Sequence, residues 1–523
     1  ETCRNIAFSE DKTKVLFTAD VNDNNTYRRR VIVENIPSSD TTYTVVQNNS
    51  YQTTTGGYDN GRPRILGGNT SSTGINEVLP QAIASGEGIT FLDNELDDIL
   101  NSKVAYATTS YNTGWMQGDI KGAFLSDTDT TNAVAAYYDD FANNNNGWGF
   151  VNTSISGGNM VITQQSLARS TDGDALNGIA AGTKLVFTFT VSGSGTGDVV
   201  IDDDGAGAGQ GGTTNYGSFS STGSYTFTAT KTASPRLRIM RTSGSNDYNI
   251  NFLNITTEYD RSVNNKGLGV YGTITKSAVA TGADLVAYSG FSNNNVLVQP
   301  YNSNLDPGTG NYSFMCWFKC PSTGAEQILM RRFGVPTVTG GTLMRIVSSS
   351  SRIQWYVRDT SSTATAVNST VALDDDSWHC AVGTRVGSTA RLYIDGKLNA
   401  SSGCSANSHD PGTTASFVIG AEEVAASPGT YQNPADVTSL ALVRYSLSAP
   451  SPEQVKKMYE EEKHLFQENA KATLYGSSDA VTALAYDEDT ELLHVGTSAG
   501  RSDLQGLRRI NNTTTAVTTA ISA

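Results

Sequence analysis

The amino-acid sequence predicts an all-β protein in which two β-sandwich modules are inserted between propeller-like blade repeats. Only 17% of the residues are charged, while Gly alone contributes 51 of the 523 residues. This balance is typical of many short strands joined by many turns. Short apolar runs alternate with turn residues along most of the chain, and only one segment has a clear helical pattern.

The charge balance limits the classes of partner. The chain carries 36 Lys and Arg against 51 Asp and Glu, a formal net charge of -15. An acidic surface repels a phosphate backbone, so we do not expect nucleic acid as a partner. No apolar run reaches about 18 residues, so we do not expect membrane insertion, and no signal peptide is visible.

The two ends of the chain resemble each other. IAFSEDKTKVLFTAD near the start and LAYDEDTELLHVGTSAG near the end both read as a strand, an acidic turn and a second strand. KVAYATTSYNTGWMQGDIKGAFL is a partial third copy. Such repeats are typical of propeller blades, and we assign residues 1–126 and 471–523 to them. A closed propeller needs more blades, which a longer parent chain or an oligomer must supply.

Residues 138–258 predict the first β-sandwich, after a linker at 127–137. Runs such as NMVITQ, KLVFTFTVSG and YNINFLNITT recur at a spacing of about ten residues, with Gly, Ser and Asn turns between them. The acidic run Asp202–Asp204 lacks the regular spacing of a calcium loop, so we interpret it as a solvated turn.

Residues 374–403, DDDSWHCAVGTRVGSTARLYIDGKLNASSG, predict a three-stranded antiparallel meander. Apolar and other residues alternate along WHCAVG and RLYI, and Asp395-Gly396 is a strong hairpin signal because both positions tolerate positive φ. His379 therefore alternates with core residues on a sheet, and we interpret it as structural rather than catalytic.

The one clear helix is predicted from Ser451 to about Asn469. Ser451 is the expected N-cap, Pro452 occupies the first turn and Gln454 completes a capping box. The strands SFMCWFKC and TSLALVRYSLS precede it. Two packed sheets with a short helix on one edge indicate a jelly roll.

Four motifs in this order resemble the laminin-G-like, concanavalin A-type jelly-roll family: LDPGTGNYSFMCWFK, DDSWHCAVGTR, ARLYIDGKL and LALVRYSLSAPSPEQVKKMY. The resemblance covers roughly residues 260–470, and we place the domain at 259–470. It implies a module that binds glycans or proteins, often with calcium, although some members are glycanases. The chain departs from the family before the V-R-Y run, where relatives carry an acidic residue and this sequence has Ser439, Leu440 and Ala441.

The upstream sandwich is similar to jelly-roll carbohydrate-binding modules, which open on D-F…G-W and close on I-D/N-x-x-x-I. The two resemblances imply oxygen ligands for a structural calcium ion, with Asn-rich turns that hold no metal as the alternative. These candidates are Asp140 and Asn251 in the sandwich, and Asn293, Asn295 and Asp306 in the laminin-G-like domain.

Exposed aromatic rings that lie among Asn, Ser or Gly are candidate platforms for a sugar ring. The candidates are Trp148, Tyr216, Tyr288, Tyr301 and Tyr431. The alternative for Trp148 is a core position, which is common for the Trp of a G-W pattern.

We do not expect an enzyme. GTSAG matches G-x-S-x-G, but no His follows Ser498, the matching repeat lacks the motif, and a hairpin explains the pattern. The concanavalin A-like glycanases place two Glu on one strand as E-x-D-x-E. Here Glu422 and Glu423 are adjacent and should point to opposite faces.

The blade repeats, the laminin-G-like jelly roll and the closing string FQENAKATLYGSSDAVTALAYDEDTELLHVGTSAGRS resemble tail fibre or related virion structural proteins of marine tailed bacteriophages. This resemblance covers roughly residues 100–137 and 260–523. It implies an extracellular protein of the virion tail that contacts other virion proteins. We expect a homo-oligomer that binds host-surface glycans or proteins without turnover. A glycan-degrading tail protein and a purely architectural fibre segment are the alternatives.

Overall fold

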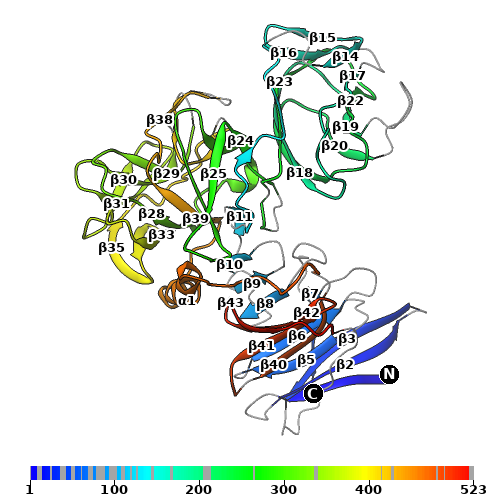
Figure 1. Cartoon of the computed structure of the whole chain (residues 1–523), viewed down its shortest axis with the longest axis vertical. Helices are drawn as coiled ribbons and strands as arrows, with labels where there is room; N and C mark the ends of the chain where they lie inside the picture. The colour runs from blue at the N-terminus through cyan, green and yellow to red at the C-terminus, as the bar shows by residue number, and fades with distance from the viewer. Residues whose placement is uncertain are drawn as a thin grey trace.

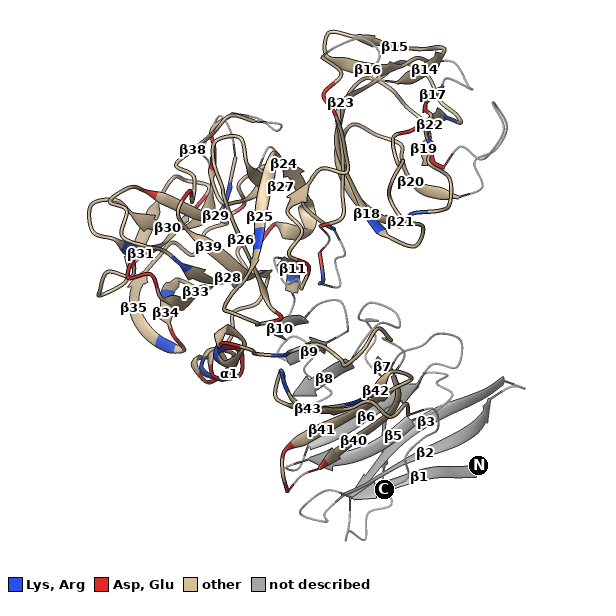
Figure 2. Ribbon diagram, viewed as in Figure 1, with Lys and Arg blue, Asp and Glu red and all other residues tan. Residues whose placement is uncertain are grey.

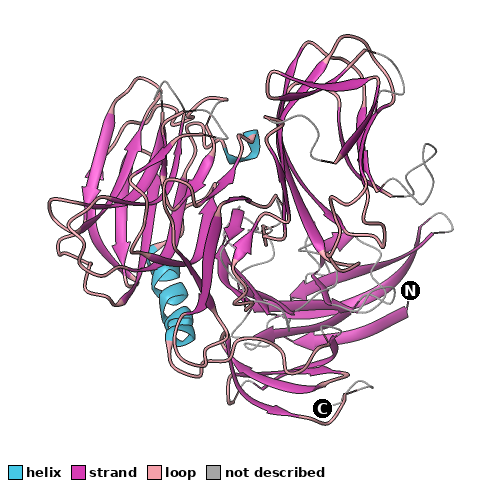
Figure 3. Ribbon diagram, turned by 45° about the horizontal axis from the view of Figure 1, so that its top comes forward, coloured by secondary structure: helices cyan, strands magenta, loops and turns pink. Residues whose placement is uncertain are grey.

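The structure is a computed structural model of the 523-residue chain (Figure 1). It describes the backbone of strands within residues 2–117, and both backbone and side chains over residues 120–517. Side chains in the second range are described except at residues 125–127, 143–146, 165–170, 204–213, 259, 263–265, 335–339, 414, 426–428, 479–480 and 488. Strands dominate these residues, with a single α-helix among them (Figure 3), which confirms the all-β prediction.

Two antiparallel sheets form the jelly roll. The larger sheet has nine strands in the order β12-β25-β26-β39-β28-β33-β34-β35, with β11 also paired to β39. Its strands are β11 (Ile120–Phe124), β12 (Ala133–Val134), β25 (Thr273–Ala278), β26 (Val286–Ser289), β28 (Tyr312–Lys319), β33 (Trp378–Val386), β34 (Thr389–Ile394), β35 (Lys397–Gly403) and β39 (Ser439–Ser446).

The smaller sheet of the jelly roll has seven strands in the order β24-β27-β36-β29-β30-β31-β32. Its strands are β24 (Gly269–Tyr271), β27 (Val296–Gln299), β29 (Gln327–Phe333), β30 (Gly341–Val347), β31 (Arg352–Arg358), β32 (Ala364–Asn368) and β36 (Phe417–Ile419). A two-stranded hairpin, β37 (Glu422–Glu423) with β38 (Tyr431–Gln432), follows β36.

The main core lies between these two sheets because alternate side chains of each strand point inward. Phe314 and Trp355, from opposite sheets, are fully buried, with ring centroids 5.3 Å apart. Gly383 lies under the Trp355 ring, where a Cβ atom would come within 2.3 Å of the indole. The predicted meander at 374–403 is confirmed as β33, β34 and β35, which pair in sequence order.

The helix α1 (Pro452–Glu462) packs on the outer face of the nine-stranded sheet, with Val455 and Met458 among its buried side chains. The capping box of Ser451 and Gln454 is confirmed. The predicted end at Asn469 is wrong, because the chain tightens into a 3-10 turn, η3 (Lys463–Phe466). This turn places the Phe466 ring on Trp317, with 4.2 Å between centroids.

The boundary of the jelly roll also differs from the prediction. Residues 120–124, predicted to belong to a blade, form β11 and pair with β39. Residues 133–134, predicted to be linker, form β12 and pair with β25. The nine-stranded sheet therefore takes two of its strands, β11 and the edge strand β12, from a segment that precedes the sandwich in the sequence.

The upstream sandwich consists of a six-stranded sheet, β15-β16-β23-β18-β21 with β13 paired to β23, and a five-stranded sheet, β14-β17-β22-β19-β20. The six-stranded sheet contains β13 (Tyr137–Asp139), β15 (Thr153–Ser156), β16 (Asn159–Ile162), β18 (Lys184–Gly193), β21 (Gly223–Thr230) and β23 (Tyr248–Thr256). The five-stranded sheet contains β14 (Trp148–Val151), β17 (Arg169–Asp172), β19 (Val199–Asp202), β20 (Asn215–Phe219) and β22 (Leu237–Arg241).

Buried polar contacts join the sandwich to the jelly roll just after β23. The Lys276 ammonium lies 3.0 Å from the Glu258 carboxylate, and the Tyr288 hydroxyl donates to the same carboxylate at 2.8 Å. Asp260 accepts a hydrogen bond from the backbone N–H of Ala123 at 2.9 Å. A buried ion pair reinforced by hydrogen bonds favours one relative placement of the two modules.

Strands from the two ends of the chain occupy the same part of the molecule (Figure 1). They form sheets of four, three, three and four strands, each an antiparallel meander. Their bounds are β1 (Thr2–Phe8), β2 (Lys14–Asp23), β3 (Thr26–Asn35) and β4 (Tyr43–Asn48); β5 (Thr54–Asp59), β6 (Arg62–Gly68) and β7 (Ile75–Glu77); β8 (Ile89–Asp93), β9 (Lys103–Ala107) and β10 (Asn112–Gln117); and β40 (Val481–Asp487), β41 (Leu492–Thr497), β42 (Gly500–Gln505) and β43 (Arg508–Thr513). This strand order agrees with blades, and a propeller stays a prediction.

Ser498 lies in the hairpin turn between β41 and β42, so the hairpin interpretation of GTSAG is confirmed. Among the residues that the structure describes, no helix is long and apolar enough to cross a membrane.

Candidate functional site

Four of the five predicted aromatic platforms lie inside the protein, so the prediction is wrong for them. Trp148, Tyr216, Tyr288 and Tyr431 expose 3%, 5%, 0% and 6% of their surface. Only Tyr301 is partly exposed. Alternation along a short strand does not reveal whether both of its faces are covered, and here the covering elements come from distant parts of the sequence.

Each buried ring has a packing role. The Trp148 indole N–H donates to the Asp139 carboxylate at 3.1 Å, which confirms the core alternative. Tyr216 stacks on Phe187 with 5.6 Å between centroids. Tyr288 belongs to the jelly-roll core, and Tyr431 packs against the outer face of the seven-stranded sheet.

The calcium candidates of the sandwich are engaged in local contacts. Asp140 is exposed, and its carboxylate accepts the backbone N–H of Ala142 at 3.0 Å. Asn251 accepts a hydrogen bond from Ser192 at 3.3 Å. The buried carboxylate at this position is Asp139, one residue earlier.

The three candidates of the jelly roll are not brought together. Asn293 and Asn295 precede β27, whereas Asp306 follows it. The Asn295 side chain accepts the Thr273 N–H at 3.2 Å and donates to the Gly290 carbonyl at 3.1 Å. Among the described residues, no group of three or more His, Cys, Asp or Glu could hold a metal ion.

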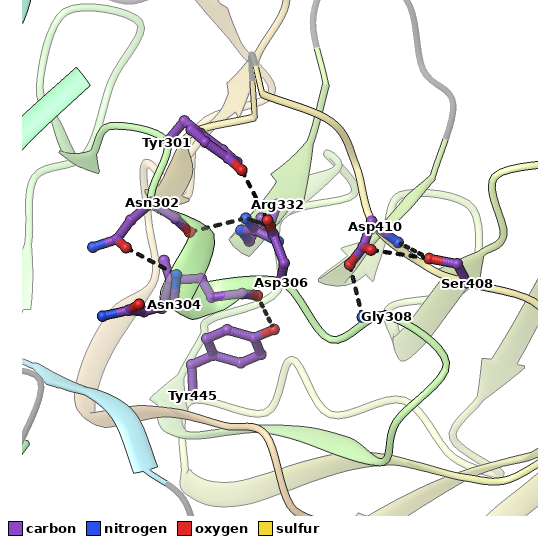
Figure 4. A network of polar contacts seen from close by, with 10 residues as sticks. Tyr301, Asn302, Asn304, Asp306, Gly308, Arg332, Ser408, Asp410 and Tyr445 are labelled. Atoms are coloured by element: carbon purple, nitrogen blue, oxygen red, sulfur yellow. Dashed lines mark hydrogen bonds and ion pairs between the residues drawn. The ribbon is translucent and has the colours of Figure 1, made fainter. Parts of the chain in front are cut away.

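Asp306 belongs instead to a polar network near the end of the central strand β29 of the jelly roll (Figure 4). Its carboxylate forms an ion pair with Arg332 of β29 and accepts the Tyr301 hydroxyl at 2.9 Å. The Arg332 side chain is 2% exposed and the Asp306 side chain 25%. Burial, reinforced by the hydrogen bond to Asp306, raises the pKa of Tyr301 above its usual value, so this hydroxyl stays protonated as a donor.

A second loop, residues 408–410, is hydrogen-bonded to the same network. Asp410 accepts the Gly308 N–H at 2.7 Å and the Ser408 hydroxyl at 3.1 Å (Figure 4). From below, the Tyr445 hydroxyl donates to the Leu305 carbonyl at 2.6 Å. We call residues 301–310 and 408–410 the rim. Its fixed backbone includes the 3-10 turn η2 (Ser303–Leu305).

The rim presents neutral polar groups outward. Ser303, Asn304, Thr309 and Gly310 are exposed, while the charges of Asp306 and Arg332 satisfy each other beneath them. His409 is buried at the back, where burial, assisted by Arg385, lowers its pKa to about 4 and keeps it neutral at pH 7. The arrangement offers a rigid set of hydroxyl, amide and backbone groups, which suits hydrogen bonding to a polyhydroxylated ligand.

Sequence reasoning missed Arg332 and Asp410. A usable signal for Arg332 was the pair of arginines in the otherwise apolar run QILMRRF, because a charge in a buried strand needs a buried partner. Asp410 has no comparable local signal, since its contact with Gly308 joins loops far apart in the sequence.

Residues 291–451 match the family described as the concanavalin A-like lectin/glucanases superfamily (Laminin_G_3). The chain contains a concanavalin A-like jelly-roll domain. This confirms the fold expected from the laminin-G-like motifs, for the matched residues. No curated protein matches the chain.

Several solved structures resemble this chain in part. Domain 4 of AbnA, a GH43 extracellular arabinanase from Geobacillus stearothermophilus in complex with arabinotriose, shares 14% identity over 38% of this chain and 89% of its own, with a TM-score of 0.28. The SAP-like pentraxin from Limulus polyphemus shares 13% over 31% and 81%, with a TM-score of 0.24. The receptor binding domain of botulinum neurotoxin C/D mosaic serotype shares 12% over 47% and 59%, with a TM-score of 0.32.

Proposed function

We propose that this chain is a virion structural and adhesion protein of the tail-fibre type, which binds host-surface glycans or proteins without turnover. The rim of the concanavalin A-like jelly-roll domain is the observation that carries the proposal. Its exposed polar groups are held in place by the ion pair of Asp306 with the buried Arg332 and by three hydrogen bonds that fix the loops. Binding therefore costs little conformational entropy.

The tail-fibre assignment is supported by the sequence motifs of the jelly roll and by the repeats at both ends of the chain. One rim alone would bind weakly. A homo-oligomer, or a particle with many copies, would gain strength by multivalency.

The alternative of a glycan-degrading protein needs two carboxyl groups that face one sugar. Glu422 accepts hydrogen bonds from Gln432 and Asn433, whereas Glu423 on the next residue is fully buried. The two carboxyl groups thus face apart. A purely architectural segment is the other alternative, and the following experiment separates all three.

The test uses the purified chain and envelope polysaccharide from a host cell. The double variant Asn304→Ala, Thr309→Ala removes exposed rim groups, and Asn294→Ala, in an exposed turn before β27, is the matched control. We expect reversible binding that the rim variant weakens and the control does not. Release of reducing sugar would indicate the degrading enzyme. Absence of binding both to the polysaccharide and to intact host cells, which also present surface proteins, would leave only architecture.

A further inference from the structure

The outer face of the seven-stranded sheet carries an alternating stripe of polar and aromatic side chains on β31. Inward-facing Ile353, Trp355 and Val357 belong to the main core, so the residues between them point outward. These outward residues are Arg352, Gln354, Tyr356 and Arg358, which we call the β31 stripe. At ~3.3 Å per residue the stripe is roughly 20 Å long, enough for several sugar rings.

A chain of hydrogen bonds crosses the sheet through the middle of this stripe. Both oxygens of Glu326 accept from Arg345 at 3.0 Å, and the Arg345 guanidinium donates to Gln354 at 2.8 Å. Gln354 then donates to the exposed Asn368 at 2.8 Å. Each side chain holds the next in a fixed orientation, so the donors and acceptors on this face are preorganised.

Tyr356 lies beside small residues. Its register partner on β32 is Ala366, and Ala364 lies opposite Arg358, both exposed. Within the described residues, its single ring contact is with Phe333, at 5.9 Å between centroids. The ring is partly exposed and lacks tall neighbours on the β32 side, which suits stacking against a sugar ring.

The two ends of the stripe carry positive charge without a partner. In the part of the chain that the structure describes, no ion pair or side-chain hydrogen bond joins Arg352 or Arg358 to another residue. Figure 2 shows acidic and basic residues interspersed along the jelly-roll strands. The stripe thus carries two unpaired guanidinium groups although the net charge of the chain is -15.

We propose that the β31 stripe binds an extended acidic glycan, with Tyr356 stacked on a sugar ring. Arg345 and the exposed Asn368 orient hydroxyl groups, and the buried Gln354 holds both of them in place. Arg352 and Arg358 pair with carboxylate or sulfate groups on the glycan. This inference rests on the proposed function as a glycan-binding protein, but it uses a different surface from the rim.

The test measures binding of the full chain to three polymers: polygalacturonate, which carries carboxylates, dextran sulfate, which carries sulfates, and neutral dextran. We expect at least one acidic polymer to bind more tightly than dextran, with an affinity that falls as salt is added. Binding of polygalacturonate alone assigns a carboxylated ligand, and binding of dextran sulfate alone assigns a sulfated one.

The double variant Arg352→Gln, Arg358→Gln should weaken acidic-polymer binding about tenfold, since it removes two charge-assisted contacts. The matched control, Arg391→Gln with Lys397→Gln, removes the same charge from the nine-stranded sheet and should change the affinity less than about twofold, since it removes no contact of the stripe. Tyr356→Leu should also weaken binding, and equal melting temperatures show that every variant is folded.

Equal weakening by the control, or equal affinity for all three polymers, would overturn the inference. If the chain still bound host polysaccharide, and the rim variant weakened this binding whereas the stripe variants did not, the proposed function would stand without the inference about the stripe. If no glycan bound at all, both the inference and the glycan-binding form of the proposed function would be contradicted.

Discussion

The Arg332 guanidinium and the Asp306 carboxylate form an ion pair at the edge of the jelly-roll core (Figure 4). The guanidinium is almost fully buried, whereas the carboxylate is a quarter exposed and also accepts the Tyr301 hydroxyl. The pair fills the position where the sequence predicted a calcium ligand, and a guanidinium there supplies the positive charge that a cation would otherwise bring.

Loss of Asp306 should destabilise the protein more than loss of the neighbouring hydroxyl. Asp306→Ala leaves Arg332 buried without a counter-charge, and we expect about 3 kcal/mol less free energy of unfolding. Tyr301→Phe removes one hydrogen bond and should cost about 1 kcal/mol. Urea unfolding measures both. Equal effects would mean that the charge of Arg332 is compensated elsewhere.

Calcium should have little effect on stability. Asp306 is paired with Arg332, and the Asn295 side chain is already hydrogen-bonded on both sides. We expect the same melting temperature with EDTA and with added calcium. A higher melting temperature with calcium, lost in Asp140→Ala or in Asn293→Ala, would place a metal in the sandwich or in the jelly roll, respectively.

Glu423 should make stability depend on pH. Burial raises its pKa from 4.5 to about 7, so the folded protein binds this proton more tightly than the unfolded chain. The free energy of unfolding should therefore fall between about pH 4.5 and 7, by up to about 3 kcal/mol. Glu423→Gln should match the parent at low pH and exceed it at pH 8. A constant difference across this range would contradict the assignment.

His379 should also make stability depend on pH, because its pKa is raised in the folded protein. The hydrogen bond to Asp395 at 2.8 Å is the main cause that raises its pKa above 6.5. Its stabilising contribution is complete below pH 6.5 and is lost as the pH rises through the folded-state pKa. In an NMR titration, Asp395→Asn should lower the His379 pKa, with Asp376→Asn as control. An unchanged titration would show that Asp395 does not act on the imidazole.

Local signals in the sequence predicted local structure. Asp395 and Gly396 adopt positive φ in the hairpin between β34 and β35, and Ser451 caps α1, because each signal acts within a few residues. The pairing of β11 with β39 joins segments more than 300 residues apart, and no local pattern contains that information.

The candidate site was less predictable for the same reason. Tyr288 and Tyr301 lie in similar Asn- and Ser-rich surroundings in the sequence, but Tyr288 is covered by Glu258 and the core whereas Tyr301 reaches the rim. Exposure depends on which distant element packs on a residue. The sequence does carry a signal for the β31 stripe, since the core residues Ile353, Trp355 and Val357 of RIQWYVR are each flanked by a polar or aromatic residue.

The central claim is that this chain binds a host-surface glycan and leaves it intact. The most direct measurement incubates the purified chain with host envelope polysaccharide and follows both bound protein and newly formed reducing ends. We expect saturable, reversible binding with no increase in reducing ends over time. A steady release of reducing ends, abolished by substitution of a single Asp or Glu, would contradict it.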